Sequence, residues 1–342
     1  MTSDATRLLS DLLRQVSRSF YTTLRVLPGA VRRQISLAYL LARATDTIAD
    51  TALVPLEQRL VSLCLLRERI LGLHQKPLDL GALAERQGSP GERALLERIE
   101  EALAMLSGFS LRDQQLIHEV LQTITSGQEL DLTRFAGAST ENIVALKTDS
   151  ELDDYTYRVA GCVGEFWTKI CRVHLFPMVP LDDAQLLADG IRFGKGLQLV
   201  NILRDMPADL RQGRCYLPEE KLSGVGLRPS DLLQSDAEPK IRPLYNSYLD
   251  RASDHLTAGW RYTNALPRSG IRVRLACAWP ILIGARTLAR LRVDNVLDGS
   301  QRVKINRAEV RNIFLRSILS YPFAGQWGRL FERAGAGLAP RR

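Results

Sequence analysis

Long apolar runs, clustered cysteines and a secretion signal are all missing from this sequence of 342 residues. No run reaches the roughly 18 apolar residues that a membrane-spanning helix needs. The five cysteines are scattered without a CxxC spacing, so we expect neither a disulfide framework nor a zinc site, and a reducing, cytoplasmic compartment fits best. The N-terminal residues include acids and lack a long apolar core, so we expect no signal peptide.

Basic residues are concentrated in the C-terminal third. The whole chain carries 46 Lys and Arg against 38 Asp and Glu, whereas from residue 241 onward there are 18 against 6. Such a region indicates an anionic partner, although arginines on solvated helix faces would give the same count. No zinc finger, RNP-like aromatic cluster or basic zipper accompanies it, so we expect no nucleic acid. Peripheral contact with an anionic membrane surface is an open alternative.

Apolar residues recur at helical spacing along most of the chain, and no series of alternating strand segments is evident. The pattern predicts an all-α protein, with helices at 4–26, 28–50, 55–75, 90–106, 111–136, 140–147, 150–174, 181–205, 238–265, 270–297 and 306–321. No linker-like change of composition divides the chain. We therefore expect one helical domain over 1–332, followed by a short flexible tail over 333–342.

The stretch 38–50, AYLLARATDTIAD, places three charged residues among apolar neighbours. Arg43, Asp46 and Asp50 are three and four residues apart, so they share one helix face. Two carboxylates one turn apart repel each other by a few tenths of a kcal/mol, which makes the pair a poor structural device. Mg²⁺ takes one or two carboxylates and completes its coordination with water and substrate phosphate. The stretch therefore predicts a magnesium site.

A second stretch, 196–209, repeats this arrangement. Asp205 and Asp209 are four residues apart, Asn201 and Gln198 lie one and two turns before Asp205, and Arg204 stands beside the pair. A lone pair of this spacing is usually a solvated face, but two such pairs, each at the end of an apolar helix, favour a function. Two facing pairs in a helical bundle would hold Mg²⁺ ions that bridge a diphosphate and make it a viable leaving group.

Two further segments mix small and polar residues at helical spacing. Residues 125–132, TSGQELDL, place Gly127 in mid-helix at a cost of ~1 kcal/mol relative to Ala, which indicates close approach of a neighbouring helix or a ligand. Residues 153–169 leave room on one face through their glycines and offer the polar tips of Tyr155 and Tyr157. A helix-packing groove explains these glycines equally well.

The polar segment Ser17-Arg18-Ser19-Phe20 interrupts an otherwise apolar helix. An arginine flanked by two hydroxyls is a good phosphate contact, because the guanidinium fork pairs with phosphate oxygens, although a surface turn would read the same way. Taken in order, these segments resemble the squalene/phytoene synthase family of head-to-head prenyl transferases, over 17–307. The segment 17–20 resembles the family's SRSF element, which helps bind diphosphate. The stretch 39–50 resembles its first aspartate-rich motif, with Arg43 at a diphosphate position and Asp46 and Asp50 as metal ligands.

The resemblance continues in the second half of the chain. Residues 155–164, YTYRVAGCVG, resemble the segment that carries the proposed catalytic tyrosine, and the stretch 198–209 resembles the second aspartate-rich motif. That motif implies substrate contacts for Gln198 and Asn201, a catalytic role for Arg204 and metal-ligand roles for Asp205 and Asp209. The sequence after it, GRCYLP, resembles a family loop whose arginine contacts phosphate, which implies that role for Arg214. Cys277-Ala278-Trp279-Pro280 looks closer to squalene synthases than to plant-type phytoene synthases, and the basic stretch with Lys304 and Arg307 is similar to one associated with NADPH or phosphate contact.

Three departures from the family pattern affect these expectations. Ala49 and Ala208 replace the glutamate that often precedes the last aspartate of each motif, which leaves the expected ligands in place. Pro207 lies inside the second motif and predicts that its helix ends or kinks there, with Asp209 on a distorted turn. Arg158 stands where eukaryotic squalene synthases have a tyrosine, so the base would be Tyr155 or Tyr157.

The resemblance implies a single large helical bundle of the isoprenoid synthase type with a central apolar cavity. It implies Mg²⁺-dependent condensation of two molecules of farnesyl diphosphate to presqualene diphosphate, followed by NADPH-dependent reduction to squalene. No GxGxxG motif follows a strand, so NADPH would bind without a Rossmann fold. The enzyme could instead stop at presqualene diphosphate, or make phytoene or dehydrosqualene. A non-catalytic assembly or lipid-binding member of the fold is less expected, because all four aspartates are present.

Overall fold

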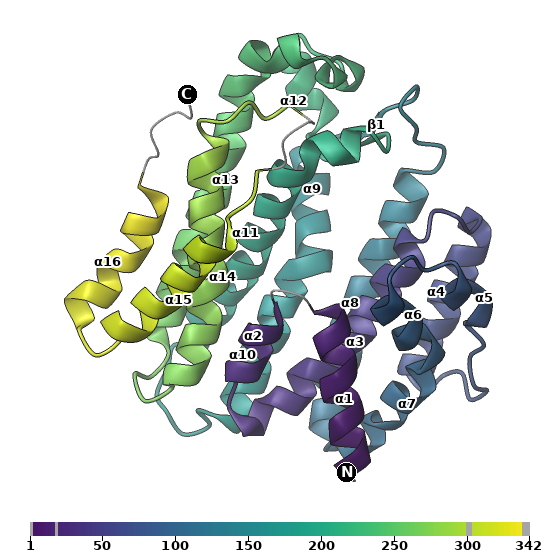
Figure 1. The fold of residues 1–342 in the computed structure, drawn as a ribbon, viewed down its shortest axis with the longest axis vertical. Coiled ribbons are helices and arrows are strands. Elements are labelled where there is room, and N and C mark those ends of the chain that lie inside the picture. Colours follow the sequence, from purple (N-terminus) through teal and green to yellow (C-terminus); the bar gives the residue numbers. More distant parts are fainter. Residues whose placement is uncertain (1–2, 18–19, 299–302, 337–342) are drawn as a thin grey trace. The chain divides into compact units, whose positions relative to one another are not determined.

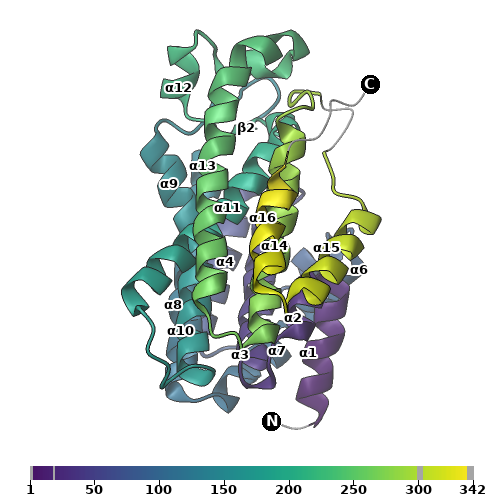
Figure 2. The same cartoon turned by 90° about the vertical axis from the view of Figure 1, so that its left-hand side faces the viewer.

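The computed structural model describes residues 3–17, 20–298 and 303–336, and these are overwhelmingly helical (Figures 1 and 2). Contacts divide the chain into two compact units, Met1–Thr133 with Phe166–Val179, and Arg134–Glu165 with Pro180–Arg342. The expectation of one domain over 1–332 stays a prediction. No helix within the described ranges is both long and apolar enough to cross a membrane.

The first unit is built around α3 (Gly29–Asp50), which follows Pro28 directly. Proline fixes its own φ near the helical value and is well tolerated at a helix start. One side of α3 is buried through Leu37, Leu40 and Leu41. The remaining elements of this unit are α1 (Ser3–Val16), α2 (Phe20–Val26), α4 (Leu56–Ile70), α5 (Gly81–Glu85), α6 (Pro90–Glu97), α7 (Ile99–Ala104), η1 (Leu106–Gly108), α8 (Leu111–Arg134) and most of α10 (Cys162–His174).

The second unit is built around α11 (Asp183–Leu210), which packs along α13 (Glu238–Ala265) and α14 (Ile271–Leu291) (Figure 2). Asp182 caps α11 by accepting a hydrogen bond from the Gln185 amide at 3.0 Å. The other elements of this unit are β1 (Val144–Ala145), α9 (Asp149–Thr156), the π-helix η2 (Tyr157–Gly161), β2 (Arg214–Cys215), α12 (Glu219–Gly224), η3 (Pro229–Leu233), η4 (Ser235–Ala237), α15 (Arg307–Ser320) and α16 (Ala324–Gly335).

The structure differs from the sequence-based helix assignment in three places. The predicted helix at 140–147 is absent: Val144 and Ala145 form β1, which pairs in parallel with β2. Its register, Val144 opposite Arg214, is fixed by long-range pairing that local periodicity does not record. The first predicted helix, 4–26, is two helices, and α16 was not predicted. Because α16 reaches Gly335, it overlaps the start of the predicted tail, while 337–342 lie outside the described residues.

Candidate active site

The first aspartate pair lies on the last turns of α3, as its spacing predicted. Arg43 Nη1 is 3.9 Å from Asp46 Oδ2, so the arginine and the first carboxylate share one face of the helix. Arg43 is also held by a charge-assisted hydrogen bond from its Nη2 to Glu92, which follows the start of α6. Asp50, at the end of α3, is exposed. The helix thus presents two carboxylates together with a guanidinium that Glu92 holds in place.

Asp46 is held in an unfavourable electrostatic environment. Crowding by protein atoms and the nearby Asp50 carboxylate raise its pKa to about 6, although Arg43 and a hydrogen bond from Gln128 Nε2 oppose that shift. The Asp46 side chain is 47% exposed, so water screens part of this effect. The raised pKa means that burial, and after it the Asp50 carboxylate, destabilises the ionised form of Asp46.

This pair fits a magnesium ion. No group of three or more His, Cys, Asp or Glu side chains converges on a common point within the described part of the chain. Mg²⁺ does not need such a cage, because one or two carboxylates with water and phosphate complete its octahedron. The donors are all oxygen, and a cation would offset both the burial and the Asp50 repulsion that raise the pKa of Asp46.

The predicted diphosphate segment 17–20 is partly described. Ser17 is buried and its hydroxyl donates to the Leu13 carbonyl, four residues earlier. Phe20 packs on Tyr39 of α3, with ring centroids 5.2 Å apart, one turn before Arg43. Arg18 and Ser19 lie outside the described residues. The structure therefore brings Phe20 to the helix of the first aspartate pair, whereas it gives the Ser17 hydroxyl a backbone partner.

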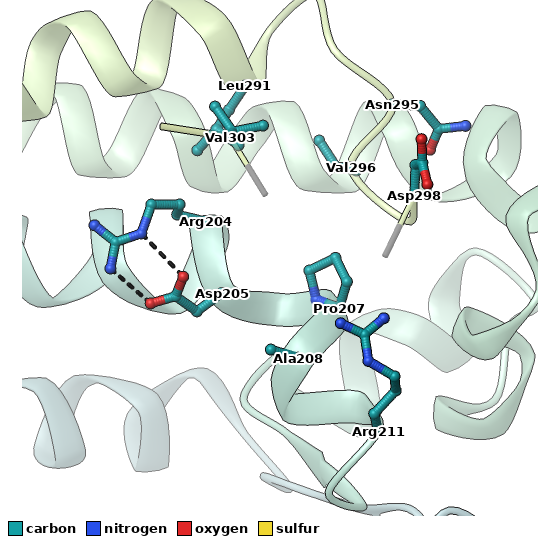
Figure 3. A pocket seen from close by; sticks show the side chains of 10 residues that line it. All are labelled: Arg204, Asp205, Pro207, Ala208, Arg211, Leu291, Asn295, Val296, Asp298 and Val303. Carbon is teal, nitrogen blue, oxygen red and sulfur yellow. Dashed lines mark hydrogen bonds and ion pairs between the residues drawn. The ribbon is translucent and has the colours of Figure 1, made fainter. Parts of the chain in front are cut away.

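The second aspartate pair lies on α11, and its first member, Asp205, lines a small pocket (Figure 3). Arg204 binds Asp205 in bidentate fashion, with Nε to Oδ1 at 2.9 Å and Nη2 to Oδ2 at 2.6 Å. Gln198 and Asn201 are together on the same helix, with 3.5 Å between the Asn201 Nδ2 and the Gln198 Oε1. The cavity, of about 60 Å³, is also lined by Val303, the residue directly before Lys304. The C-terminal basic stretch therefore begins at the edge of the pocket that holds Asp205.

Pro207 does not end α11. The helix continues to Leu210 and includes Asp209, so the predicted end at Pro207 is wrong, while the alternative of a kink stays a prediction. Proline has no N–H to donate to the carbonyl four residues earlier, which belongs to Leu203. The hydroxyl of Tyr245, a fully buried residue of α13, donates to that same carbonyl at 2.8 Å. A side chain from the neighbouring helix thus supplies the hydrogen bond that the proline removes.

The glycine-rich segment predicted around 153–169 spans the end of α9, the π-helix η2 and the start of α10, and η2 packs against α11. A Cβ on Gly194 would lie 2.1 Å from the Ala160 carbonyl oxygen, and one on Gly164 would lie 1.9 Å from that of Gly190. Glycine is required at such contacts because any side chain would push the backbones apart. The helix-packing interpretation of these glycines is therefore confirmed, and the turn of π-helix is a feature often found at functional sites.

The two candidate tyrosines have different surroundings. Tyr155 is buried and stacked on Tyr216, with ring centroids 4.9 Å apart and hydroxyls 3.5 Å apart. Tyr157 lies in the π-helix, and its hydroxyl donates to Glu165 at 2.9 Å. The Lys195 ammonium lies 5.8 Å from the centre of the Tyr157 ring. The Tyr157 hydroxyl is therefore hydrogen-bonded to a carboxylate, whereas the Tyr155 ring is stacked in the core.

The remaining predicted binding residues lie on three different pieces of backbone. Arg214 is on β2, with its guanidinium 6.0 Å from the centre of the Phe135 ring. Lys304 is exposed, and its carbonyl accepts a hydrogen bond from Arg290 at 3.0 Å. Arg307 is the exposed first residue of α15. The side chains of Lys304 and Arg307 have no polar partner among the described residues, so both are available to an anion.

Comparison with known proteins identifies the family of the chain. The family model described as squalene/phytoene synthase matches residues 13–309. The chain belongs to the squalene/phytoene synthase family. This family comprises head-to-head prenyl transferases, and membership confirms the resemblance found in the motifs.

Relatives within the squalene/phytoene synthase family carry different names. The chain is 32% identical over 269 residues to the bifunctional lycopene cyclase/phytoene synthase of Gibberella fujikuroi, covering 76% of this chain and 43% of that protein. It therefore spans less than half of that relative. It is 30% identical over 254 residues to the presqualene diphosphate synthase of Rhodopseudomonas palustris, covering 74% of this chain and 77% of that protein. A solved structure of TcSQS with a ligand matches with a TM-score of 0.78 at 23% identity, over 99% of this chain and 94% of that chain, which confirms the all-α fold.

Three residues at the candidate site were not predicted from the sequence. Gln128 lies in the segment 125–132 of α8, where Gly127 indicated close approach of a helix or a ligand. The glycine therefore marked the correct turn of α8, but it did not indicate that Gln128 contacts Asp46. Glu92 is 49 positions from Arg43, and nothing local marks it as its partner. Tyr245 reads as an ordinary core tyrosine in α13. A search for the donor that replaces the missing proline N–H would have called for such a residue.

Proposed function

We propose that this chain is a squalene synthase, which condenses two molecules of farnesyl diphosphate to presqualene diphosphate and reduces that intermediate to squalene. The observation that carries the proposal is the repeated platform. Each compact unit presents one pair of carboxylates four residues apart on a helix, with an arginine in an ion pair with the first carboxylate, at 3.9 Å for Arg43 and 2.6 Å for Arg204. Membership of a prenyl transferase family supports the substrate class.

The four aspartates are the proposed metal ligands, with Asp46 and Asp50 on α3 and Asp205 and Asp209 on α11. When bound, Mg²⁺ supplies positive charge that stabilises diphosphate as a leaving group. The neighbouring arginines provide guanidinium donors for phosphate oxygens, as do the predicted contacts of the 17–20 segment and Arg214. Glu92 and Gln128 have a positioning role, because they hold the Arg43 and Asp46 side chains in place.

The condensation needs one proton acceptor. The allylic C–O bond of one farnesyl diphosphate breaks and diphosphate leaves with the electron pair. The double bond of the second molecule attacks the resulting cation, and loss of a proton closes the cyclopropane of presqualene diphosphate. We assign that proton to the hydroxyl oxygen of Tyr157 or Tyr155. The hydrogen bond from Tyr157 to Glu165 supports Tyr157, because the carboxylate can accept the phenolic proton as the oxygen gains another.

Lys304 and Arg307 are the proposed contacts for the phosphate groups of NADPH. Their exposed cationic side chains without partners among the described residues fit such an anion. When bound, NADPH supplies the hydride that completes the second step to squalene. The five cysteines are free thiols, which supports a reducing, cytoplasmic location.

A second candidate within the family is an enzyme that stops at presqualene diphosphate. It is favoured by the relative of that name, which this chain matches over 77% of its length. Coupling to phytoene or dehydrosqualene is the corresponding candidate from the phytoene synthase relatives.

The deciding experiment incubates the purified protein with farnesyl diphosphate and Mg²⁺, with and without NADPH, and identifies the products. Squalene that forms only with NADPH supports the first proposal. Presqualene diphosphate in both tubes replaces it with the second candidate. An absence of turnover by natively folded protein, with geranylgeranyl diphosphate tried as well, would falsify the enzymatic proposal.

A further inference from the structure

The second unit contains a cavity of about 390 Å³ between α14, α15 and α16, helices that lie side by side in Figures 1 and 2. Three arginines line it, Arg286, Arg316 and Arg333, together with the apolar side chains of Leu282, Ile313 and Leu330. None of these residues belongs to the aspartate platforms, the tyrosine segment or the proposed NADPH contacts. The cavity therefore combines cationic and apolar walls at a place that the proposed reaction does not use.

Two of the three arginines have no anionic partner. Arg286 Nε lies 3.5 Å from Glu309 Oε1 and shares that carboxylate with Arg290. The guanidinium groups of Arg316 and Arg333 have neither a hydrogen bond nor an ion pair with any described residue. Each guanidinium offers a planar fork of donors that matches phosphate oxygens. Two such forks at one cavity define a site for a phosphate-bearing group.

The outward side of the same helix is apolar. Leu315, Ile318 and Leu319 of α15 and Phe323, just after it, are between 47% and 61% exposed. On a helix, Leu315 lies on the same face as Ile318 and Leu319. Arg316, which lines the cavity, directly follows Leu315 and so lies on the adjacent side of the helix. Large apolar side chains scattered singly over a surface are ordinary, but a group of four within nine residues marks an interaction surface.

The net charge of this region is also positive. Residues 303–335 contain six Lys and Arg and two Glu, and one of those acids, Glu309, is already paired with Arg286 and Arg290. A soluble anion would need the arginines and not the exposed apolar group, whereas an apolar protein partner would leave the two arginines without counter-charges. A surface that is apolar and anionic at once satisfies both features, and an anionic phospholipid bilayer has this character.

We propose that α15 and α16 form a membrane-docking surface, in which a phospholipid phosphate occupies the cavity at Arg316 and Arg333. In this arrangement Leu315, Ile318, Leu319 and Phe323 enter the interfacial layer of the bilayer beside that lipid. The proposal assigns a lipid site to a place that the synthase reaction does not use, and it rests on neither the aspartates nor the reaction product. It also specifies which part of the basic C-terminal third contacts the membrane.

The test measures sedimentation of the full chain with phosphatidylcholine vesicles and with vesicles that also contain phosphatidylglycerol, without any prenyl substrate. We expect binding to the phosphatidylglycerol vesicles that weakens as salt is raised. The double variant Arg316→Gln/Arg333→Gln should bind them about 30-fold more weakly, the factor expected for two cations near an anionic surface. The matched control is Arg86→Gln/Arg112→Gln, which removes the same charge from two exposed arginines of the first unit.

A second variant, Leu315→Ser/Leu319→Ser, tests the apolar part and should weaken binding by about tenfold or more, because exposed leucines lose their burial in the interface. Both leucines are exposed, so this variant is expected to fold normally, and thermal unfolding of each protein checks that. Failure to bind phosphatidylglycerol vesicles at low salt would overturn the proposal. An equal loss of vesicle binding in the control variant Arg86→Gln/Arg112→Gln would also overturn it, because the loss would then depend only on the net charge of the protein. Titration with inorganic phosphate provides the last arm: saturable binding that depends on Arg316 and Arg333, without vesicle binding, would assign the cavity to a soluble anion instead.

Discussion

Removal of the Tyr245 hydroxyl tests how α11 continues through a proline. The Leu203 carbonyl lacks a helical donor because residue 207 is proline, and Tyr245 donates to it at 2.8 Å inside the core. A buried carbonyl left without a partner costs about 1–3 kcal/mol. We therefore expect Tyr245→Phe to lower the free energy of unfolding by roughly 2 kcal/mol in the wild-type background.

The same change should cost less where the backbone donor is restored. In Pro207→Ala the Ala amide can donate to the Leu203 carbonyl, so Tyr245→Phe should then cost less than about 1 kcal/mol. The resulting coupling energy between the two positions is about 1 kcal/mol or more, within the range for residues that share one hydrogen-bonding group. Urea unfolding of the wild type, the two single variants and the double variant, followed by circular dichroism, measures it.

Tyr248→Phe is the matched control for this cycle. Tyr248 lies one turn further along α13, and its hydroxyl bonds Asp149 at 2.8 Å rather than a carbonyl of α11. Its substitution should cost the same with proline or alanine at position 207. The reasoning is refuted if the cost of Tyr245→Phe is equal in the two backgrounds to within about 0.5 kcal/mol, the usual limit of additivity.

Three further predictions concern the site. Without Mg²⁺, Asp46→Asn should be more stable than the wild type, because the raised pKa makes ionisation of Asp46 costly in the folded state. The difference in stability should grow as the pH rises from 3.8 through about 6. Thermal unfolding measures it, and a difference that does not change with pH would contradict the prediction. Gln128→Leu should raise the Mg²⁺ concentration for half-maximal activity about 10-fold or more, because it removes the hydrogen bond that orients Asp46. The control Gln122→Leu, on the exposed side of the same helix, should leave that concentration unchanged. Equal effects of the two variants would show that Gln128 does not position Asp46. Gly194→Ala should destabilise the protein by several kcal/mol, since its Cβ would lie 2.1 Å from the Ala160 carbonyl oxygen. Gly328→Ala in α16, where a Cβ would meet no atom within 4 Å, should leave stability unchanged or raise it by up to about 1 kcal/mol. Urea unfolding measures both changes, and the opposite order of stability would contradict the prediction.

The periodic apolar pattern was sufficient to predict the main helices. The apolar face of α3 and the four-residue spacing of Asp46 and Asp50 are both local properties, and both were predicted correctly in place. The same holds for Asp205 on α11. Helix content and the face that carries each aspartate pair follow from residues within a few turns of one another, which is why the sequence alone records them.

The features that the sequence did not reveal depend on distant partners. Val144 and Ala145 form β1 because β2 lies alongside them, and β2 is about 70 residues later in the chain. The end of α11 was placed too early because the local rule for Pro207 omits the hydroxyl that Tyr245 supplies from another helix. Propensity describes the local cost of a proline, but tertiary contacts decide whether a helix ends there.

The most direct test of the central claim, that both carboxylate pairs serve one Mg²⁺-dependent reaction, is the rate of diphosphate release from farnesyl diphosphate. We predict release by the wild type only with Mg²⁺, and a loss of at least about a hundredfold in Asp46→Asn and also in Asp205→Asn, with little further loss when both are combined, because groups that act as a unit are not additive. Each variant should remain folded at the assay temperature, which thermal unfolding checks. A folded Asp46→Asn or Asp205→Asn protein that releases diphosphate at the wild-type rate would contradict the account.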